Sequence, residues 1–207
     1  MTLIMKSDAY ARGDVIAANM HRDRKKVFVD LLKWDVPVIA GEYEIDQFDH
    51  SGAVYLISAE DDGAHRGSIR LLPTTRPHIL GSLFPELCDC PVPSGANVYE
   101  ITRGCLSPRL RASERLRVRN QLTTAAVEFA LFNGIDTFTC IADGGWYSQI
   151  LSLGWRCEPL GLPRIVDDHM TGALRIAVTR DTPRLLLEAG TYCHSTIELA
   201  TPALMAA

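Results

Sequence analysis

Two oppositely charged side chains, Glu100 and Arg103, lie three residues apart in an otherwise uncharged, β-prone stretch, residues 98–103. In a regular strand the side chains alternate, so Glu100 and Thr102 share one face and Arg103 takes the other. Either the two charges serve different faces, or a β-bulge near Ile101 re-aims one of them. Such charges cost stability unless they are paired or used. The stretch alone favours a structural ion pair, although a carboxylate in a partly buried strand also suits general-base catalysis.

A third charged side chain, Arg70, lies inside the apolar segment of residues 67–72. A buried arginine needs a carboxylate partner. Asp46, Asp49 and Glu100 are the candidates that the sequence offers.

Arg24 and Phe28 lie four residues apart in a predicted helix of residues 14–33, so we expect them to share one helix face. A cation beside an aromatic ring can hold a ligand that carries a carboxylate or an onium centre. The alternative is a solvated helix face. Pro37 ends this helix, and residues 35–52 are predicted to form an irregular, acidic loop.

The remaining pattern predicts the elements that position these side chains. Apolar stretches separated by turn signals indicate a hairpin of residues 54–60 and 67–72. An amphipathic pattern that ends at Gly134 indicates a helix of residues 114–133. Further strands are expected at residues 3–6, 98–103, 135–142, 155–159 and 173–179, with shorter helices near Phe84, before Gly154 and after Pro183. This order predicts one α/β domain with a mixed sheet and helices on both faces.

The bulk composition excludes several classes of protein. The chain has 207 residues, 47% hydrophobic and 22% charged, with a net charge of −4, which argues against a nucleic-acid or membrane-surface binder. It has no apolar run of transmembrane length and no signal-peptide core, so a cytoplasmic location is expected, with its six cysteines as thiols. Cys88 and Cys90 have no second pair at zinc spacing, so no metal site is predicted.

Four local strings and nine separated positions resemble the signature of the acyl-homoserine-lactone synthases, the bacterial autoinducer synthases. The strings are RKKVFVDLLKWDVP, EYEIDQFD, GSIRLLPTTRPHIL and VYEITR. The nine positions are Arg24, Phe28, Trp34, Asp46, Asp49, Arg70, Phe84, Glu100 and Arg103. The resemblance spans roughly residues 20–160, and this many positions in register form a specific signal.

The resemblance implies an acetyltransferase-like (GNAT-like) α/β/α sandwich with a mixed central sheet. It implies a single autoinducer-synthase domain over residues 1–207, with a donor-binding lid at about 14–52 and an acyl-binding half at about 98–190. The implied reaction transfers an acyl group from acyl carrier protein or coenzyme A to the amine of S-adenosylmethionine. Lactone closure then releases methylthioadenosine, a quorum-sensing signal is produced, and no cofactor takes part. The expected partners include no nucleic acid and no membrane.

The resemblance also implies roles for individual residues. We expect Glu100 to be the general base, Asp46 to hold the substrate ammonium, and Arg103 to complete the catalytic set. Asp49, Arg70 and Arg103 are expected to form an ion network that fixes Glu100 and the lid. The expected substrate-binding residues are Arg24, Phe28, Trp34, Arg70, Phe84, Asp49, Thr102, Cys140 and Trp146.

The sequence departs from the family pattern at two positions. Gly104 stands where an aromatic residue commonly follows the arginine, and Cys140 stands where a Ser or Thr often tunes the preference for 3-oxo acyl groups. A thiol is a poorer hydrogen-bond partner, so we expect an unsubstituted or otherwise unusual acyl group.

Three alternatives remain open at this stage. Arginines between residues 109 and 119 suit a carrier protein or the phosphates of coenzyme A, or they form a solvated surface. The runner-up function is an acetyltransferase-type N-acyltransferase acting on another amine. The third function is a non-catalytic ligand sensor.

Overall fold

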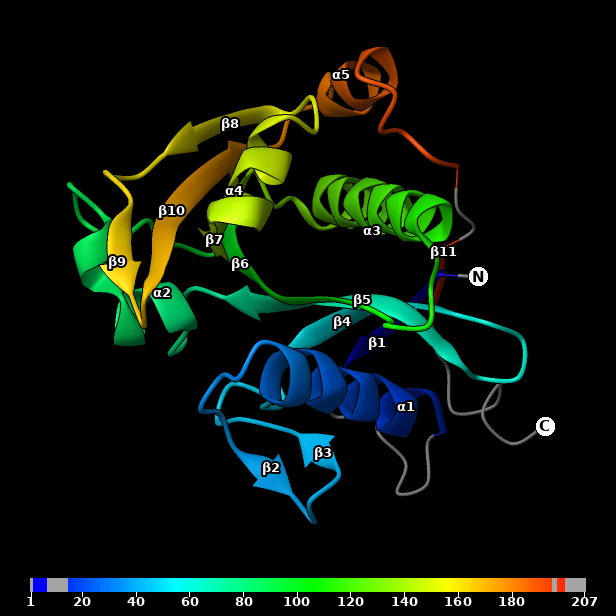
Figure 1. Ribbon diagram of the computed structural model, residues 1–207. Coiled ribbons are helices and arrows are strands. Elements are labelled where there is room, and N and C mark those ends of the chain that lie inside the picture. The colour runs from blue at the N-terminus through cyan, green and yellow to red at the C-terminus, as the bar shows by residue number, and fades with distance from the viewer. Residues whose placement is uncertain (1, 7–14, 195–196, 200–207) are drawn as a thin grey trace. The chain divides into compact units, whose positions relative to one another are not determined.

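A computed structural model describes residues 2–6, 15–194 and 197–199 (Figure 1). The chain divides into two compact units. Unit 1 consists of Met1–Arg70, Arg103–Ala125 and His194–Ala207, and unit 2 consists of Leu71–Thr102 and Ala126–Cys193. Strands β5 (His65–Pro73) and β6 (Val98–Leu106) contribute residues to both units.

The described strands form a mixed main sheet. Its order is β11 (Ile197–Leu199), β1 (Thr2–Lys6), β4 (Val54–Ala59), β5, β6, β7 (Thr137–Asp143), β10 (His169–Ala177) and β8 (Arg156–Pro159), with β9 (Arg164–Val166) beside β10. The pairs β1–β11 and β6–β7 are parallel, whereas β1–β4, β7–β10 and β10–β8 are antiparallel. The prediction of an α/β fold with a mixed sheet is therefore confirmed.

Unit 1 carries an unusual helix. The α-helix α1 (Val15–Arg24) continues without a break as the π-helix η2 (Lys25–Leu31). The sequence predicted one α-helix over residues 14–33, and residue 14 lies outside the described residues. A π-helix has a wider turn, so the α-helical spacing assumed for Arg24 and Phe28 was wrong. π-Helical turns are frequent at functional sites.

The stretch after this helix is more regular than predicted. Residues 35–52 were expected to be an irregular loop, but they contain a small antiparallel pair, β2 (Val38–Ile39) and β3 (Tyr43–Glu44). Two-residue strands leave almost no alternating pattern in a sequence, which explains why this pair was missed.

Unit 2 has helices on both faces of its strands. Leu80 of α2 (Ile79–Leu83) and Leu87 of the 3₁₀ helix η3 (Pro85–Leu87) pack on Ala173 of β10. The next residue of β10, Gly172, points to the other face, where a Cβ atom would lie 2.5 Å from the ring of Tyr147 in α4 (Gly144–Leu151). Unit 2 is therefore an α/β/α sandwich in its own right.

The boundaries of the other elements differ from the prediction by a few residues. The long helix α3 (Ala112–Asn133) ends before Gly134, whose φ of 69° is the left-handed conformation expected of a helix-ending glycine. The C-terminal helix α5 (Thr182–Glu188) was also expected. The short strands β9 and β11 were not predicted. Among the described residues, no helix is long and apolar enough to cross a membrane.

Candidate active site

A buried network of alternating charges lies in unit 1. Its members are three arginines and three acids, namely Arg24, Arg70, Arg103, Glu44, Asp46 and Asp49. Arg24 donates from Nε to Glu44 Oε2 at 2.5 Å and from both Nη atoms to Asp49 at 2.9 Å. Arg24 is only 1% exposed. Equal numbers of positive and negative groups let these buried charges compensate one another.

Arg70 lies at the centre of this network. It donates from Nη1 and Nη2 to the two oxygens of Asp46 at 2.7 and 3.1 Å, and its Nη1 lies 2.8 Å from Asp49 Oδ1. The Tyr55 hydroxyl donates to the same Asp49 oxygen at 2.6 Å. Burial alone would raise the pKa of Asp49, but Arg24 and Arg70 hold that pKa far below its usual range. The prediction that Arg70 needs carboxylate partners is confirmed for Asp46 and Asp49.

Arg103 joins the network to an aromatic pair. Its Nε donates to Glu44 at 3.1 Å and its Nη2 to Asp46 at 2.5 Å. Its guanidinium carbon lies 5.6 Å from the centre of the Phe28 ring and 5.7 Å from that of Trp34. The φ of Arg103 is 50°, a strained value for a residue with a side chain. The irregular backbone thus falls at Arg103, two residues beyond Ile101, where a bulge was one of the two options that the sequence left open.

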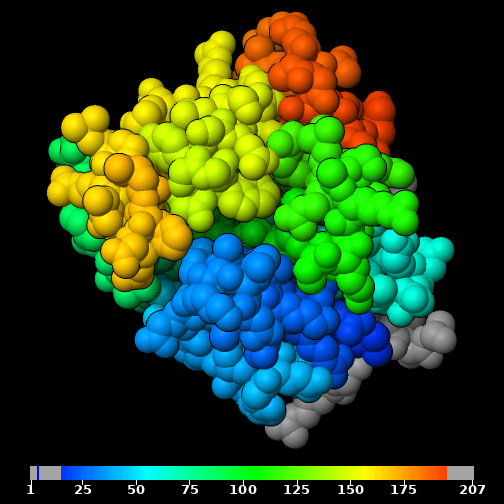
Figure 2. Space-filling view, in the orientation of Figure 1, coloured from blue at the N-terminus to red at the C-terminus, as the bar shows by residue number. Residues whose placement is uncertain are grey.

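Phe28 and Trp34 stack face to face, with ring centres 4.7 Å apart and planes inclined by 9°. Phe28 is 3% exposed, whereas Trp34 is 37% exposed. Figure 2 shows α1 and η2, in blue, forming part of the molecular surface. The network's own Arg103 already contacts both rings, so a bound onium centre would be a second cation near this aromatic pair.

Glu100 is held by the start of a helix in unit 2. Its Oε2 accepts from the backbone N–H of Ile79 at 2.7 Å, and its Oε1 accepts from that of Leu80 at 2.8 Å. His78, the residue that would ordinarily cap α2, makes no side-chain cap. An ionised carboxylate only accepts hydrogen bonds, which matches these two donors. Glu100 is fully buried.

The strand register separates Glu100 from Cys140, one of the predicted substrate-binding residues of unit 2. Glu100 is paired with Thr139, and Ile101 is paired with Cys140. Adjacent residues of a strand point to opposite faces. Glu100 therefore shares the face on which α2 packs, whereas Cys140 shares the face on which Tyr147 packs.

The other predicted residues of unit 2 differ in their surroundings. Phe84 packs with Leu80 and Leu87 in the apolar cluster around Ala173. Thr102 is 8% exposed. The backbone N–H of Trp146, in the first turn of α4, donates to Asp143 at 3.4 Å.

Cys140 is a buried thiol. Burial, together with the nearby Cys157 and Glu100, raises the pKa of its thiol far above the usual range. Cys140 therefore behaves as a small apolar residue with a weak S–H donor.

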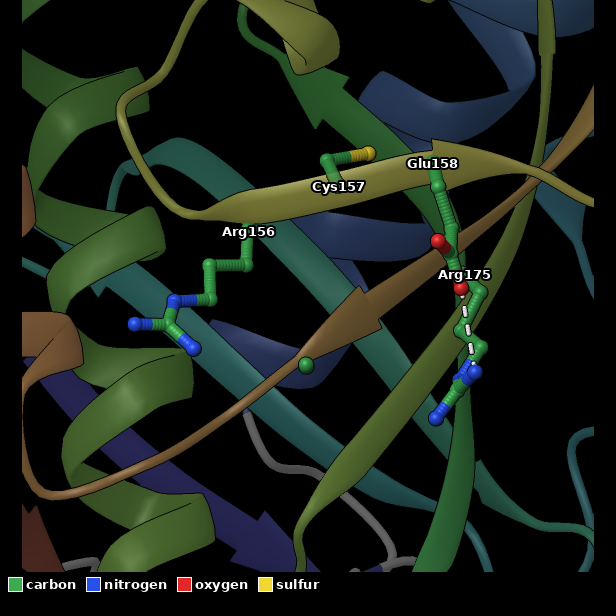
Figure 3. Close-up of a pocket in the computed structure, with 5 residues that line it drawn as sticks. Arg156, Cys157, Glu158 and Arg175 are labelled. Carbon is green, nitrogen blue, oxygen red and sulfur yellow. Dashed lines mark hydrogen bonds and ion pairs between the residues drawn. The ribbon is translucent and has the colours of Figure 1, made fainter.

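A cavity of about 280 Å³ lies over β8 and β10, lined by Arg156, Cys157, Glu158, Arg175 and Ala177. Figure 3 shows Arg156 and Arg175 extending to one side of the strands and Cys157 to the other. Arg175 pairs with Glu158 at 3.0 Å. None of the predicted site residues lines this cavity. Within residues 2–6, 15–194 and 197–199, no group of three or more His, Cys, Asp or Glu side chains is suited to hold a metal.

Comparison with known proteins decides the family. A family model described as autoinducer synthase matches residues 8–184, well over half of the sequence. The chain belongs to the autoinducer synthase family. This family member is 34% identical to an acyl-homoserine-lactone synthase of Rhizobium etli over 148 residues, which cover 70% of this chain and 69% of that relative.

Solved structures extend the likeness to the fold of this autoinducer synthase. The CoA-dependent acyl-homoserine lactone synthase BjaI, solved with SAM and isopentyl-CoA, matches with a TM-score of 0.85 and 26% identity over 98% of this chain and 94% of BjaI. An acyl-CoA N-acyltransferase from Pseudomonas aeruginosa matches with a TM-score of 0.59 and 17% identity, over 86% and 99% of the two chains. The second likeness concerns the fold alone. The predicted acetyltransferase-like sandwich is confirmed.

One member of this synthase's charged cluster, Glu44, and one neighbour that donates to it, Tyr55, were not predicted. Glu44 is fully buried and binds both Arg24 and Arg103. The available signal was the spacing of three acids at alternate positions, Glu42, Glu44 and Asp46, which an extended segment would place on one side. Tyr55 was overlooked because it lies in an otherwise apolar strand.

Proposed function

We propose that this autoinducer synthase joins the amine of S-adenosylmethionine to an acyl group and closes the product to a homoserine lactone. The observation that carries the proposal is the buried cluster of Arg24, Arg70 and Arg103 with its three acids, beside the stacked Phe28 and Trp34. It accounts for most of the residues that carry the family resemblance. S-Adenosylmethionine enters as a substrate, and no resident cofactor is part of the proposal.

Unit 1 supplies the proposed nucleotide pocket. The half-exposed Trp34 offers a π-face to adenine or to the sulfonium. Asp46 is proposed to bind the substrate ammonium, although its oxygens are already used by other donors. Its oxygens already accept from Arg70, Arg103 and the Phe48 N–H, so the ammonium must share them. The distances support a different role for Asp46 best. Asp46 binds Arg103, and Arg103 contacts both rings of the aromatic pair, so Asp46 helps to position that pair.

Glu100 is the proposed general base. The methionine amine must lose a proton to attack a thioester carbonyl, and a positioned carboxylate can take that proton directly or through one water. A carboxylate has about four lone-pair sites, and Ile79 and Leu80 use two of those on Glu100. In the second step the substrate's own carboxylate displaces methylthioadenosine, so the protein mainly supplies orientation.

The proposed acyl donor is an acyl thioester of coenzyme A or of acyl carrier protein. BjaI, solved with isopentyl-CoA, supports the first. The arginines at 109–119 are not uniformly available to a donor, because Arg109 and Arg115 donate to backbone carbonyls. Arg117 is exposed. Charge reversal at Arg115 and Arg117 should raise the KM for a carrier-protein donor, and an unchanged KM would remove that docking surface.

We also propose that the enzyme works in the cytoplasm. Support comes from Cys88, Cys90, Cys105, Cys140 and Cys157, which are thiols in the structure and fit a reducing compartment. Cell fractionation with an antibody against the chain tests this location.

The reaction is tested with the purified chain, S-adenosylmethionine and a panel of acyl-CoA and acyl-carrier-protein thioesters. Mass spectrometry should find one methylthioadenosine for each lactone formed. Acylation of another amine without methylthioadenosine would indicate an N-acyltransferase instead. Tight binding of S-adenosylmethionine without any turnover would indicate a ligand sensor.

A further inference from the structure

A second buried polar cluster lies in unit 1, and neither the sequence pattern nor the proposed reaction uses it. Asp23, His65 and Ser68 are 2%, 1% and 1% exposed. The ring atom Nδ1 of His65 lies 3.0 Å from Asp23 Oδ2, and its Nε2 lies 3.0 Å from Ser68 Oγ. We call these three residues the Asp23 clamp.

The protonation states within the Asp23 clamp follow from its contacts. Burial lowers the pKa of His65, which keeps the ring neutral. Burial would raise the pKa of Asp23, but the hydrogen bond from His65 and the Ser107 hydroxyl, with the charge of Arg109, bring it to about 2. An ionised carboxylate only accepts, so His65 donates from Nδ1 and accepts at Nε2 from the Ser68 hydroxyl. Each polar atom of the His65 ring therefore has a defined partner.

The order Asp–His–Ser is also that of a hydrolytic triad, but this chemistry does not fit here. A nucleophilic serine must reach its substrate, and Ser68 is buried. A fully satisfied buried network instead fixes one geometry of the groups that it joins.

The Asp23 clamp joins two separate segments, and Arg109 attaches a third to it. Asp23 lies in the last turn of α1, and His65 and Ser68 lie in β5. Arg109, from the segment after β6, donates to the backbone carbonyl of His65 at 2.8 Å and lies 3.5 Å from Asp23. Between the two clamp residues of β5, a Cβ atom at Gly67 would lie 2.7 Å from a methyl group of Val118. The strand is therefore packed too tightly to shift without disturbing α3.

The point that the clamp fixes is the change from α-helix to π-helix. Asp23 immediately precedes Arg24, where α1 ends and η2 begins. Arg24 belongs to the charged network, where it pairs with Glu44 and Asp49, and Phe28 of η2 stacks on Trp34. A rotation of the helix at Asp23 would change the direction of both side chains.

We propose that Asp23, His65 and Ser68 are positioning residues for S-adenosylmethionine: they lock the α-to-π change that aims Arg24 and carries Phe28 onto Trp34. The inference rests on the proposed function, in which this aromatic pair binds the nucleotide. It predicts that damage to the clamp weakens binding of S-adenosylmethionine more than it slows the chemical steps.

The test compares two amides at one position. In His65→Asn the side-chain N–H can stand where Nδ1 stands and keep the bond to Asp23, whereas in His65→Gln the amide reaches toward Ser68 and that bond is lost. His65→Gln and Asp23→Leu, which has no acceptor for the His65 N–H, should each raise the KM for S-adenosylmethionine about tenfold, the size of one lost buried hydrogen bond. The KM for the acyl donor and kcat should change less than about threefold. His65→Asn should stay near the unmodified KM.

Asp30→Asn is the matched control, because it removes an exposed pair with Lys25 from the same π-helix. It should leave every constant unchanged. Equal effects of His65→Asn and His65→Gln, or an unchanged KM in Asp23→Leu, would overturn the inference.

Hydrogen exchange separates this inference from the proposed function. Amides of residues 24–34 should exchange faster in His65→Gln than in His65→Asn, whatever the reaction. If the unmodified chain makes no lactone but this difference is seen, the proposed function fails and the clamp stands. If lactone is made and the exchange of the two variants is the same, the clamp fails alone.

Discussion

The carboxylates of the two units are stabilised in different ways. In unit 1, Glu44, Asp46 and Asp49 are neutralised by the guanidinium groups of Arg24, Arg70 and Arg103. In unit 2, Glu100 accepts hydrogen bonds from two backbone N–H groups of α2. A buried ion pair that loses one member leaves an uncompensated charge, whereas a backbone N–H keeps a partner if an amide oxygen replaces the carboxylate. We therefore expect substitutions in the first cluster to change stability and substitution of Glu100 to change turnover.

The largest expected effect comes from Arg70→Met, which removes the guanidinium group that Asp46 and Asp49 share. The free energy of unfolding should fall by about 3–5 kcal/mol, as for other broken buried pairs. Denaturant unfolding followed by circular dichroism measures it. Arg184→Met removes an exposed pair with Glu188 and should change stability by less than about 1 kcal/mol. Similar values for both variants would contradict the stabilising role given to the buried charges of unit 1.

Glu100→Gln should mainly lower turnover. The loss of a general base lowers kcat by about two orders of magnitude or more. One donor of α2 would face the amide NH₂, so a stability loss of about 1–3 kcal/mol is also expected. Single-turnover kinetics with S-adenosylmethionine in excess measures the chemical step. Glu158→Gln, an exposed acid of the same unit, is the control and should be neutral. Near-normal kcat in Glu100→Gln would assign the base to a substrate group.

Lowering the pH should destabilise unit 1 through protonation of His21. Burial and the charge of Arg24 lower the pKa of His21 to about 4, from 6.5 in the unfolded chain. Below pH 6.5 the unfolded state therefore binds more protons, so stability falls as the pH falls toward 4. The expected loss is about 2 kcal/mol between pH 7 and pH 5.

Denaturant unfolding at both pH values tests this dependence. His21→Asn should flatten it, because asparagine can keep the bond to the Glu44 carbonyl without titrating. An equal loss in His21→Asn would assign the acid sensitivity to other groups.

The features that the sequence predicted correctly are those with a strong local signal. Arg70 was recognisable because an arginine in an apolar strand demands a carboxylate, and Asp46 and Asp49 were among the three acids named. Helix α3 was recognisable because Val118, Leu122 and Ala126 recur at helical spacing and the pattern ends at Gly134. Strong local signals of this kind can be read from the sequence without knowledge of the fold.

Other features depended on distant partners. The π-helical turn after Arg24 has no pattern of its own and is accompanied by contacts of Asp23 with β5, 42 residues away in sequence. The capping of α2 by Glu100 joins residues about 20 apart. The opposite faces of Glu100 and Cys140 followed only from the register of β6 and β7. Such information is held by pairing between elements and not by any one segment.

The smallest expected effect sharpens the comparison within unit 2, where Cys140 and Glu100 lie on opposite faces. If the acyl chain lies on the Cys140 face, Cys140→Ser adds a hydroxyl donor for a 3-oxo group without touching Glu100. One neutral hydrogen bond is worth about 1 kcal/mol, so the ratio of 3-oxo to unsubstituted product should rise about fivefold. Mass spectrometry of lactones made from paired acyl donors measures this ratio. Cys105→Ser is the control, because Cys105 is an equally buried thiol in unit 1 and should leave the ratio unchanged. An unchanged ratio in Cys140→Ser would place the acyl group away from this thiol, and the Glu100 face of the sheet would then be the next to probe.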